Sequence, residues 1–280
     1  MNLRIGKVAR FGAMAALLLT LFAISVPAAF AQAKAGHENQ AHAVLRHTPR
    51  GTTFLSWDPK SENLTVTITL FGLAANSTHP AHIHAGDCDD NGPIVYPLNN
   101  VVADAAGRAT TTTVIPEVEG GIPNGAWYVN VHNGPGLSPA AQFDPIACGN
   151  VFNRHHARSV SVHLGATNAP NQAASGFTTL KLSKDGTLTV TVTLHGLVPG
   201  SAHAAHIHAG SCESQLPGNV VYPLTTVVGD AQGNSTSVTV IPNVSSIPED
   251  AWYVNVHRTT DLSTQTGFDP IACGNVEDEA

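Results

Sequence analysis

Positive charge is scarce in this sequence, and the motifs of common enzyme classes are missing. The 280-residue chain has 13 lysines and arginines against 20 aspartates and glutamates, for a formal net charge of −7. An acidic protein is poorly suited to bind nucleic acid or an anionic membrane surface, and it repels anionic substrates unless a local cationic centre is present. The sequence has no Gly-x-Ser-x-Gly motif, no Walker loop and no thiol–histidine pair. Hydrolase and nucleotide chemistry therefore have no support.

Helical periodicity is also nearly absent, and strict alternation takes its place. Residues 64–70 and 188–194 alternate apolar side chains with threonines, which is typical of a strand with one buried face. Further strands are expected at residues 110–115, 127–132, 235–241 and 252–257, with turns rich in glycine and proline between them. Short strands separated by such turns predict an all-β protein built as an antiparallel sandwich or barrel.

An apolar stretch at the N-terminus predicts an export signal. Arg4, Lys7 and Arg10 precede an apolar run at residues 11–26, and Ala29-Phe30-Ala31 forms an A-x-A cleavage site. The run is short for a membrane span, which needs about 20 apolar residues. We expect residues 1–31 to be a signal peptide, which makes the protein secreted, either extracellular or periplasmic, with no membrane attachment after cleavage. Removing three basic residues leaves a mature net charge of about −10.

One constellation of residues occurs twice, about 125 positions apart. Each copy has a His-x-x-His-x-His run, a cysteine four residues later, a Trp-Tyr-Val-Asn-Val-His segment and a closing Ala-Cys-Gly-Asn. Repetition at a fixed period identifies the structural unit. We expect a flexible leader at residues 32–42, a first β domain at 43–154 and a second at 155–280.

The repeated histidines form a candidate metal site in each domain. In a strand, His82 and His84 project to one side and Ile83 to the other, so their imidazoles lie about 6 to 7 Å apart on one face. His132, at the end of the Trp-Tyr-Val-Asn-Val-His segment, is the expected third ligand. Three neutral imidazoles with an open position suit Cu(II) or a catalytic zinc. The corresponding residues of the second copy are His206, His208 and His257.

The remaining histidines are assigned other roles. His79 and His203 have the wrong parity to coordinate the same ion, so we expect them to hydrogen-bond and orient a ligand or a turn. A structural reading of the whole cluster, as polar side chains that hold loops together, stays open beside the metal reading. Most of the others should be solvated: His37, His42, His47, His155, His156, His163 and His195.

The four cysteines predict one disulfide in each repeat. An even count with two cysteines per repeat is typical of an exported protein with internal disulfides. Four cysteines allow three pairings, and the repeat symmetry favours Cys88–Cys148 and Cys212–Cys273. Metal ligation is the alternative, but these cysteines lack the close spacing of a zinc site.

At these residues the chain resembles two families. The Pro-Ala-His-Ile-His and Ala-Ala-His-Ile-His runs, residues 91–95 and the Tyr-Val-Asn-Val-His segments resemble the CHRD (chordin) domain, which occurs in tandem in secreted proteins. The histidine spacing, with Gly-Asp-Cys and a late Ala-Cys-Gly, resembles the copper/zinc superoxide dismutases. That resemblance implies tandem Greek-key domains of the dismutase fold. It also implies copper ligands at His82, His84, His132, His206, His208 and His257, with supporting positions at His79 and His203.

The chain departs from the dismutase pattern at three points. No histidine lies between His84 and His132, or between His208 and His257, so the bridging imidazole and the zinc-binding loop are not found. Pro145 and Pro270 stand where that family has an anion-guiding arginine. Any enzymatic activity would thus be dismutase-like at most, and we expect it to be weak or absent.

Two functional hypotheses follow. The first is a secreted tandem protein whose domains each bind a copper-type ion through three histidines, zinc being less favoured, with superoxide-related redox chemistry as its possible extension. The alternative is a non-enzymatic extracellular CHRD interaction module, in which the histidines are structural and a surface binds an extracellular protein or polymer.

Overall fold

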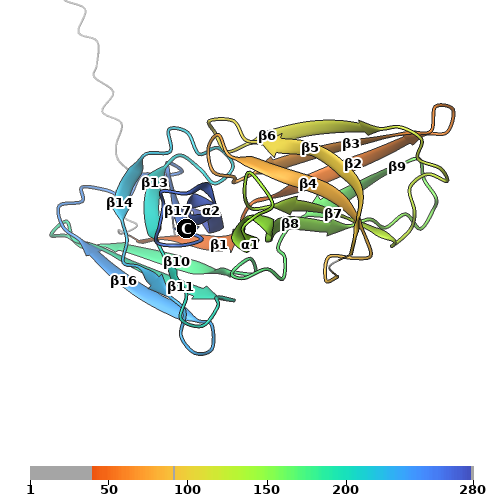
Figure 1. The fold of residues 1–280 in the computed structure, drawn as a ribbon. Coiled ribbons are helices and arrows are strands. Elements are labelled where there is room, and N and C mark those ends of the chain that lie inside the picture. Colours follow the sequence, from red (N-terminus) through yellow and green to blue (C-terminus); the bar gives the residue numbers. More distant parts are fainter. Residues whose placement is uncertain (1–39, 91, 279–280) are drawn as a thin grey trace, which may run out of the picture. The chain divides into compact units, whose positions relative to one another are not determined.

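The computed structural model describes residues 40–90 and 92–278, and these residues form an all-β, antiparallel protein (Figure 1). Only two short helices occur among them, α1 (Ala140–Phe143) and α2 (Gln265–Phe268). The predicted signal peptide lies outside the described residues, as does the leader up to residue 39. Within the described part, no helix is both long enough and apolar enough to cross a membrane.

Strands dominate both halves of the chain, and those expected from alternation are confirmed at the same positions. Up to the link near residue 155 the strands are β1 (Gln40–His47), β2 (Arg50–Asp58), β3 (Asn63–Phe71), β4 (Thr78–Ala85), β5 (Ile94–Val102), β6 (Ala109–Ile115), β7 (Trp127–His132) and β8 (Pro145–Asn150). After it come β9 (Ser159–Leu164), β10 (Ser175–Leu182), β11 (Leu188–His195), β12 (Ala202–His203), β13 (Ala205–Ala209), β14 (Val220–Pro223), β15 (Val227–Val228), β16 (Ser235–Ile241), β17 (Trp252–His257), β18 (Pro270–Asn275) and β19 (Glu277–Asp278).

Alternation in β3 shows why these segments are strands. Leu64, Val66, Ile68 and Leu70 are buried, while the threonines between them point outward. Thr67 hydrogen-bonds across to Thr112 of β6 at 3.0 Å. Each strand thus satisfies its backbone in the sheet and buries one apolar face, which is the condition for a stable antiparallel layer.

The two repeats exchange their first strands. β1, which opens the first repeat, lies between β18 and β10 of the second and pairs antiparallel with both. β9, which opens the second repeat, pairs with β2 of the first, and a bridge between Cys148 and Gly165 connects it to β8. In Figure 1 the orange-red β1 lies beside β10, and the green β9 lies beside β2.

The hydrophobic cores follow the exchanged strands. Ala41, Ala43 and Leu45 of β1 are buried with residues of the second repeat. Val162 and Leu164 of β9 are buried with residues of the first. The strands β2 to β9 therefore share one core that is continuous in sequence. β1 and the segment after β9 share the other.

The pairing of β1 and β9 bears on two expected boundaries, the end of the leader and the division between the two domains. Residues 40–42 belong to β1, where they pair with residues 179–181 of β10, so the leader cannot extend to residue 42 as expected. The boundary between the first and the second domain, expected between residues 154 and 155, stays a prediction. The pairing adds that each repeat gives its first strand to the sheet of the other.

Both predicted disulfides are present. Cys88 and Cys148 are joined in the first half, and Cys212 and Cys273 in the second, with sequence separations of 60 and 61 residues. Closing loops of this length stabilises a fold by about 4 kcal/mol each in the chain-entropy model. Each disulfide fixes the loop after β4 or β13 to the sheet, close to the histidine clusters.

Candidate metal centre

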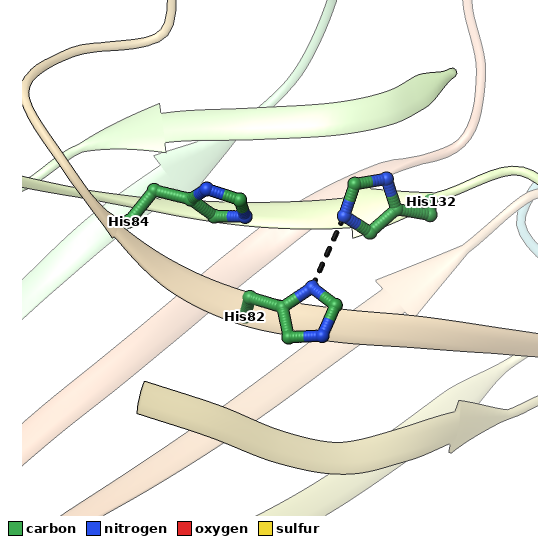
Figure 2. A group of neighbouring side chains, drawn as sticks. All are labelled: His82, His84 and His132. Carbon is green, nitrogen blue, oxygen red and sulfur yellow. Dashed lines mark hydrogen bonds between the residues drawn. The ribbon is translucent and has the colours of Figure 1, made fainter. Parts of the chain in front are cut away.

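Neighbouring strands bring His82, His84 and His132 together in the first half. β4 and β7 are antiparallel partners, and the alternation of β4 sends Ile83 into the core while both histidines face the other way. His132 ends β7 on the same face. Figure 2 shows the three rings pointing toward one another. One ring nitrogen from each lies within 4.8 Å of the other two.

The rings are buried and held by the backbone. His82, His84 and His132 are 8%, 4% and 0% exposed. Nδ1 of His84 hydrogen-bonds the carbonyl of Gly92 at 2.9 Å, and Nδ1 of His132 bonds the carbonyl of Phe143. A carbonyl only accepts, so both Nδ1 atoms carry the proton and both Nε2 atoms present a lone pair.

The third ring completes the cluster through its other nitrogen. Nδ1 of His82 lies 3.1 Å from Nε2 of His132 (Figure 2). Because the lone pair of His132 Nε2 must accept in this contact, the proton resides on His82 Nδ1. Moving that proton to Nε2 of the same ring would free a third lone pair toward the same point.

The second half repeats the arrangement with His206, His208 and His257. Ring centroids of His206 and His208 are 5.4 Å apart, and those of His206 and His257 are 5.2 Å apart, against 5.5 and 5.1 Å in the first half. Nδ1 of His208 and of His257 bond backbone carbonyls, of Gly218 and Phe268 respectively. The geometry is therefore a property of the repeat.

Burial favours the neutral form of five of these imidazoles. It lowers the pKa of His82 to about 4, helped by repulsion from His132 and His84. It lowers the pKa of His257 to about 4 as well, with repulsion from His206 and His208 adding to the effect. The pKa values of His132, His206 and His208 are lowered for the same primary reason. Neutral imidazole is the form that coordinates a metal.

His79 and His203 lie behind the clusters. Nδ1 of His79 hydrogen-bonds the carbonyl of His132 at 2.9 Å, and its Nε2 bonds the hydroxyl of Ser77 at 2.7 Å. Nδ1 of His203 bonds the carbonyl of His257 at 3.0 Å, and its Nε2 bonds Ser201. Both nitrogens of each ring are engaged, so these residues cannot coordinate an ion and instead fix the strand end that carries a cluster histidine.

Sequence reasoning missed several neighbours of the clusters. Tyr128 stacks on His84 and Tyr253 on His208, with ring centroids 5.0 and 5.1 Å apart. The alternation of the Trp-Tyr-Val-Asn-Val-His segment could have indicated the tyrosines. The carbonyl partners come from loops without a sequence signal.

The expectation that most of the other histidines are solvated is wrong for His47. Nε2 of His47 hydrogen-bonds the carbonyl of Ile146 at 3.0 Å, and burial lowers the pKa of its ring to about 4. This residue ends β1, so the strand exchange places it against β8 and β18. That placement has no signal in the sequence.

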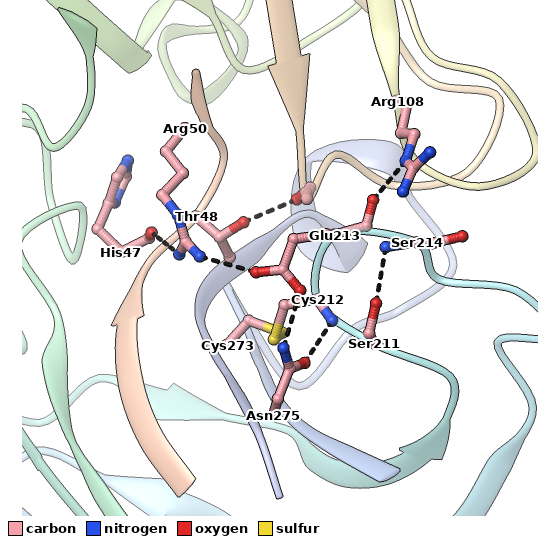
Figure 3. A network of polar contacts seen from close by, with 11 residues as sticks. His47, Thr48, Arg50, Arg108, Ser211, Cys212, Glu213, Ser214, Cys273 and Asn275 are labelled. Carbon is pink, nitrogen blue, oxygen red and sulfur yellow. Dashed lines mark hydrogen bonds and ion pairs between the residues drawn. A yellow bond between two sulfur atoms is a disulfide. The ribbon is translucent and has the colours of Figure 1, made fainter. Parts of the chain in front are cut away.

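The loop that supports His208 is also fixed by the first repeat. Glu213, in the disulfide loop, forms an ion pair with Arg50 at 3.1 Å, and its carbonyl accepts a hydrogen bond from Arg108 (Figure 3). Asn275 bonds both Glu213 and the backbone of Cys212. The same loop carries Gly218, whose carbonyl orients His208.

The geometry and the unpaired nitrogens of the clusters would allow each of them to hold a metal ion. Three nitrogens that bind one ion at about 2.1 Å lie about 3.4 to 3.6 Å apart in a tetrahedral or trigonal arrangement. The cluster nitrogens lie within 4.8 Å of one another, so the most distant would move closer by about 1 Å on binding. Buried nitrogens normally have partners. Among the described residues, four of the buried cluster nitrogens have none: Nε2 of His84, Nδ1 of His206, Nε2 of His208 and Nε2 of His257.

Comparison with known proteins identifies the repeats. A family model for the CHRD domain matches residues 31–135 and 160–262, about three quarters of the chain. No curated protein matches the chain. Each matched region contains the three histidines of one cluster, and the closing Ala-Cys-Gly-Asn of each copy lies beyond it. The chain therefore belongs to the CHRD domain family, with two of its domains in tandem.

Proposed function

We propose that this protein is exported and that each of its two CHRD domains binds one copper-type ion through three histidines. His82, His84 and His132 hold the ion in the first half, and His206, His208 and His257 in the second. The two disulfides and the acidic composition suit a protein that works outside the cytoplasm. Its functional partner is the metal ion itself.

One observation carries this proposal: buried imidazole nitrogens without hydrogen-bond partners converge in both halves. Orphaned polar atoms cost free energy unless a ligand satisfies them. A metal ion is a ligand that several converging lone pairs can bind at once. Three nitrogen ligands favour Cu(II) over Zn(II), because copper lies higher in the affinity order of divalent ions.

When bound, copper would supply a centre able to change oxidation state. The residues of the chain hold the imidazoles neutral, fix two of the three rings through backbone carbonyls and keep bulk water away by burial. Pro145 and Pro270 begin β8 and β18, close to His132 and His257, and give no positive charge to attract superoxide. We therefore expect metal binding without fast dismutation.

Metal content tests the proposal directly. The purified protein, loaded with Cu(II) and dialysed, should retain two ions per chain. His82→Ala/His84→Ala should retain one, and adding His206→Ala/His208→Ala should leave none. His155→Ala/His156→Ala, in the exposed link, is the matched control and should still retain two. A wild-type protein that loses all copper on dialysis would favour the non-enzymatic interaction module instead.

A further inference from the structure

An asparagine lies beside each histidine cluster. Asn130 of β7 and Asn255 of β17 occupy the face that also carries Tyr128 and His132, or Tyr253 and His257. In the sheet, Asn130 pairs directly with His82 and Asn255 with His206. Each amide is therefore next to a proposed ligand.

Both asparagines have an acceptor that nothing in the described protein satisfies. Asn130 is 6% exposed and Asn255 is 2% exposed, and the Oδ1 atom of each is buried without a hydrogen-bond partner among the described residues. In Asn153, another buried asparagine, Nδ2 donates to the carbonyls of Ile122 and Ala157, and Oδ1 accepts from the backbone N–H of Ala157. An orphaned acceptor at the same place in both repeats indicates that a ligand supplies the missing donor.

A cavity adjoins each asparagine. In the first half it has a volume of about 70 Å³ and is lined by His84, Tyr128, Asn130 and Phe143, among others. In the second half it has a volume of about 150 Å³, with His208, Tyr253, Asn255 and Phe268 in the equivalent positions. Such spaces accommodate one or a few molecules the size of water.

We propose that Asn130 and Asn255 are positioning residues that accept a hydrogen bond from a small neutral ligand, such as water, at the open side of each metal site. The inference rests on the proposed metal binding. It predicts that each site binds ligands that donate a hydrogen bond, such as water, more tightly than anions that have no proton.

The selectivity follows from the unpaired acceptor. A water molecule donates to Oδ1 and satisfies it, whereas azide has no proton and leaves it buried and unpaired. A site built around a hydrogen bond rejects a ligand that cannot make it. The acidic net charge acts in the same direction.

Azide binding to the Cu(II)-loaded protein tests this inference. The full chain with His206→Ala/His208→Ala would present only the first site, and azide would be titrated through its charge-transfer absorption. Asn130→Leu, of similar size but without an acceptor, should bind azide about three- to tenfold more tightly. Asn130→Asp keeps an acceptor and should bind azide no better than the parent.

Two further measurements distinguish an Asn130 that contacts the ligand from an Asn130 that only stabilises the fold. The parent should show exchangeable deuterons coupled to Cu(II) after transfer to D2O, and Asn130→Leu should lose part of this signal. The metal-free Asn130→Leu protein should be at least as stable to heat as its parent, because an orphaned acceptor has been removed. A structural asparagine would instead make the variant less stable.

The possible failures are distinguishable. A parent that does not retain copper overturns the proposed function and this inference with it. A parent that retains copper, but whose azide affinity is unchanged or weakened by Asn130→Leu, overturns the inference alone. Weakened binding would show that the amide N–H, rather than Oδ1, faces the ligand.

Discussion

At the scale of single residues, each cluster histidine is defined by what its second nitrogen does. His84 and His132 donate from Nδ1 to carbonyls, so the lone pair of each Nε2 faces the cluster. His79 uses both nitrogens and so supports the site without entering it. Parity along the strand was enough to predict this division. The identity of the carbonyl partners was not predictable, because any residue can supply a backbone oxygen.

Acid should destabilise the metal-free protein well above the pH at which carboxylates titrate. Burial lowers the pKa of His47 and of His79 to about 4, from an ordinary 6.5. Below pH 6.5 the unfolded chain takes up these protons while the folded protein does not. Stability is therefore complete above about pH 6.5 and is lost as the pH falls toward 4, by up to about 3 kcal/mol for each such histidine.

Denaturant unfolding at several pH values measures this effect. His79→Phe should flatten the dependence between pH 6.5 and 4, because one of the responsible groups is gone. His163→Phe, at an exposed ring, serves as the control. A free energy of unfolding that stays constant down to pH 4 would contradict the assignment.

The support that His79 gives to His132 should be visible in metal affinity. His79→Phe removes the hydrogen bond to the carbonyl of His132 while keeping a ring of similar size. We expect copper affinity at the first site to fall about 10- to 100-fold, as is usual for residues that orient a ligand. The second site in the same chain, supported by His203, is the internal control, and competitive chelation separates the two affinities. Equal loss at both sites would indicate general destabilisation.

At the scale of elements, the close packing of the exchanged strands depends on a glycine in the Ala-Cys-Gly-Asn segment. A Cβ on Gly149 would lie 2.2 Å from the carbonyl oxygen of His163 in β9, and one on Gly274 would lie 2.6 Å from that of Val44 in β1. Both contacts are with backbone, which cannot move aside without breaking sheet pairing. The sequence showed this glycine in both repeats, but its reason appears only once β1 and β9 are placed.

Gly274→Ala should therefore weaken the attachment of β1. We expect a loss of about 2 to 4 kcal/mol, comparable to other backbone clashes in a core. Gly136→Ala is the control, since its Cβ would meet only a flexible glutamine side chain at 3.0 Å. Amide exchange of residues 41–46 would show whether the loss is local to β1. Unchanged protection there would contradict the clash.

At the scale of the whole molecule, the segment that shares one hydrophobic core does not coincide with one sequence repeat. The individual strands could be predicted from alternation, and the disulfides and the clusters from comparison of the two repeats. The exchange of β1 and β9 could not, because alternation shows that a strand has one buried face and does not show which sheet receives it. In the structure, strands β2 to β9 are continuous in sequence, and their core includes Val162 and Leu164.

A fragment spanning residues 48–167 should consequently fold on its own and bind one copper ion. A fragment spanning residues 32–154 matches the sequence repeat more closely but lacks β9, which leaves an edge of β2 unpaired and removes two core residues. Heat unfolding with circular dichroism should give a cooperative transition for the first fragment and a weak or absent one for the second. The reverse result would show that the exchanged strands are not required.

The position of β1 has a consequence for how the protein is made. Its neighbours in the finished sheet are residues 176–181 of β10 and residues 272 and 273 of β18. The residues of a whole domain are thus synthesised after β1 and before the strands that pair with it. Pairings between segments so distant in sequence form slowly. β1 is the first strand of the described residues, and its apolar face stays unprotected until β10 and β18 have been synthesised.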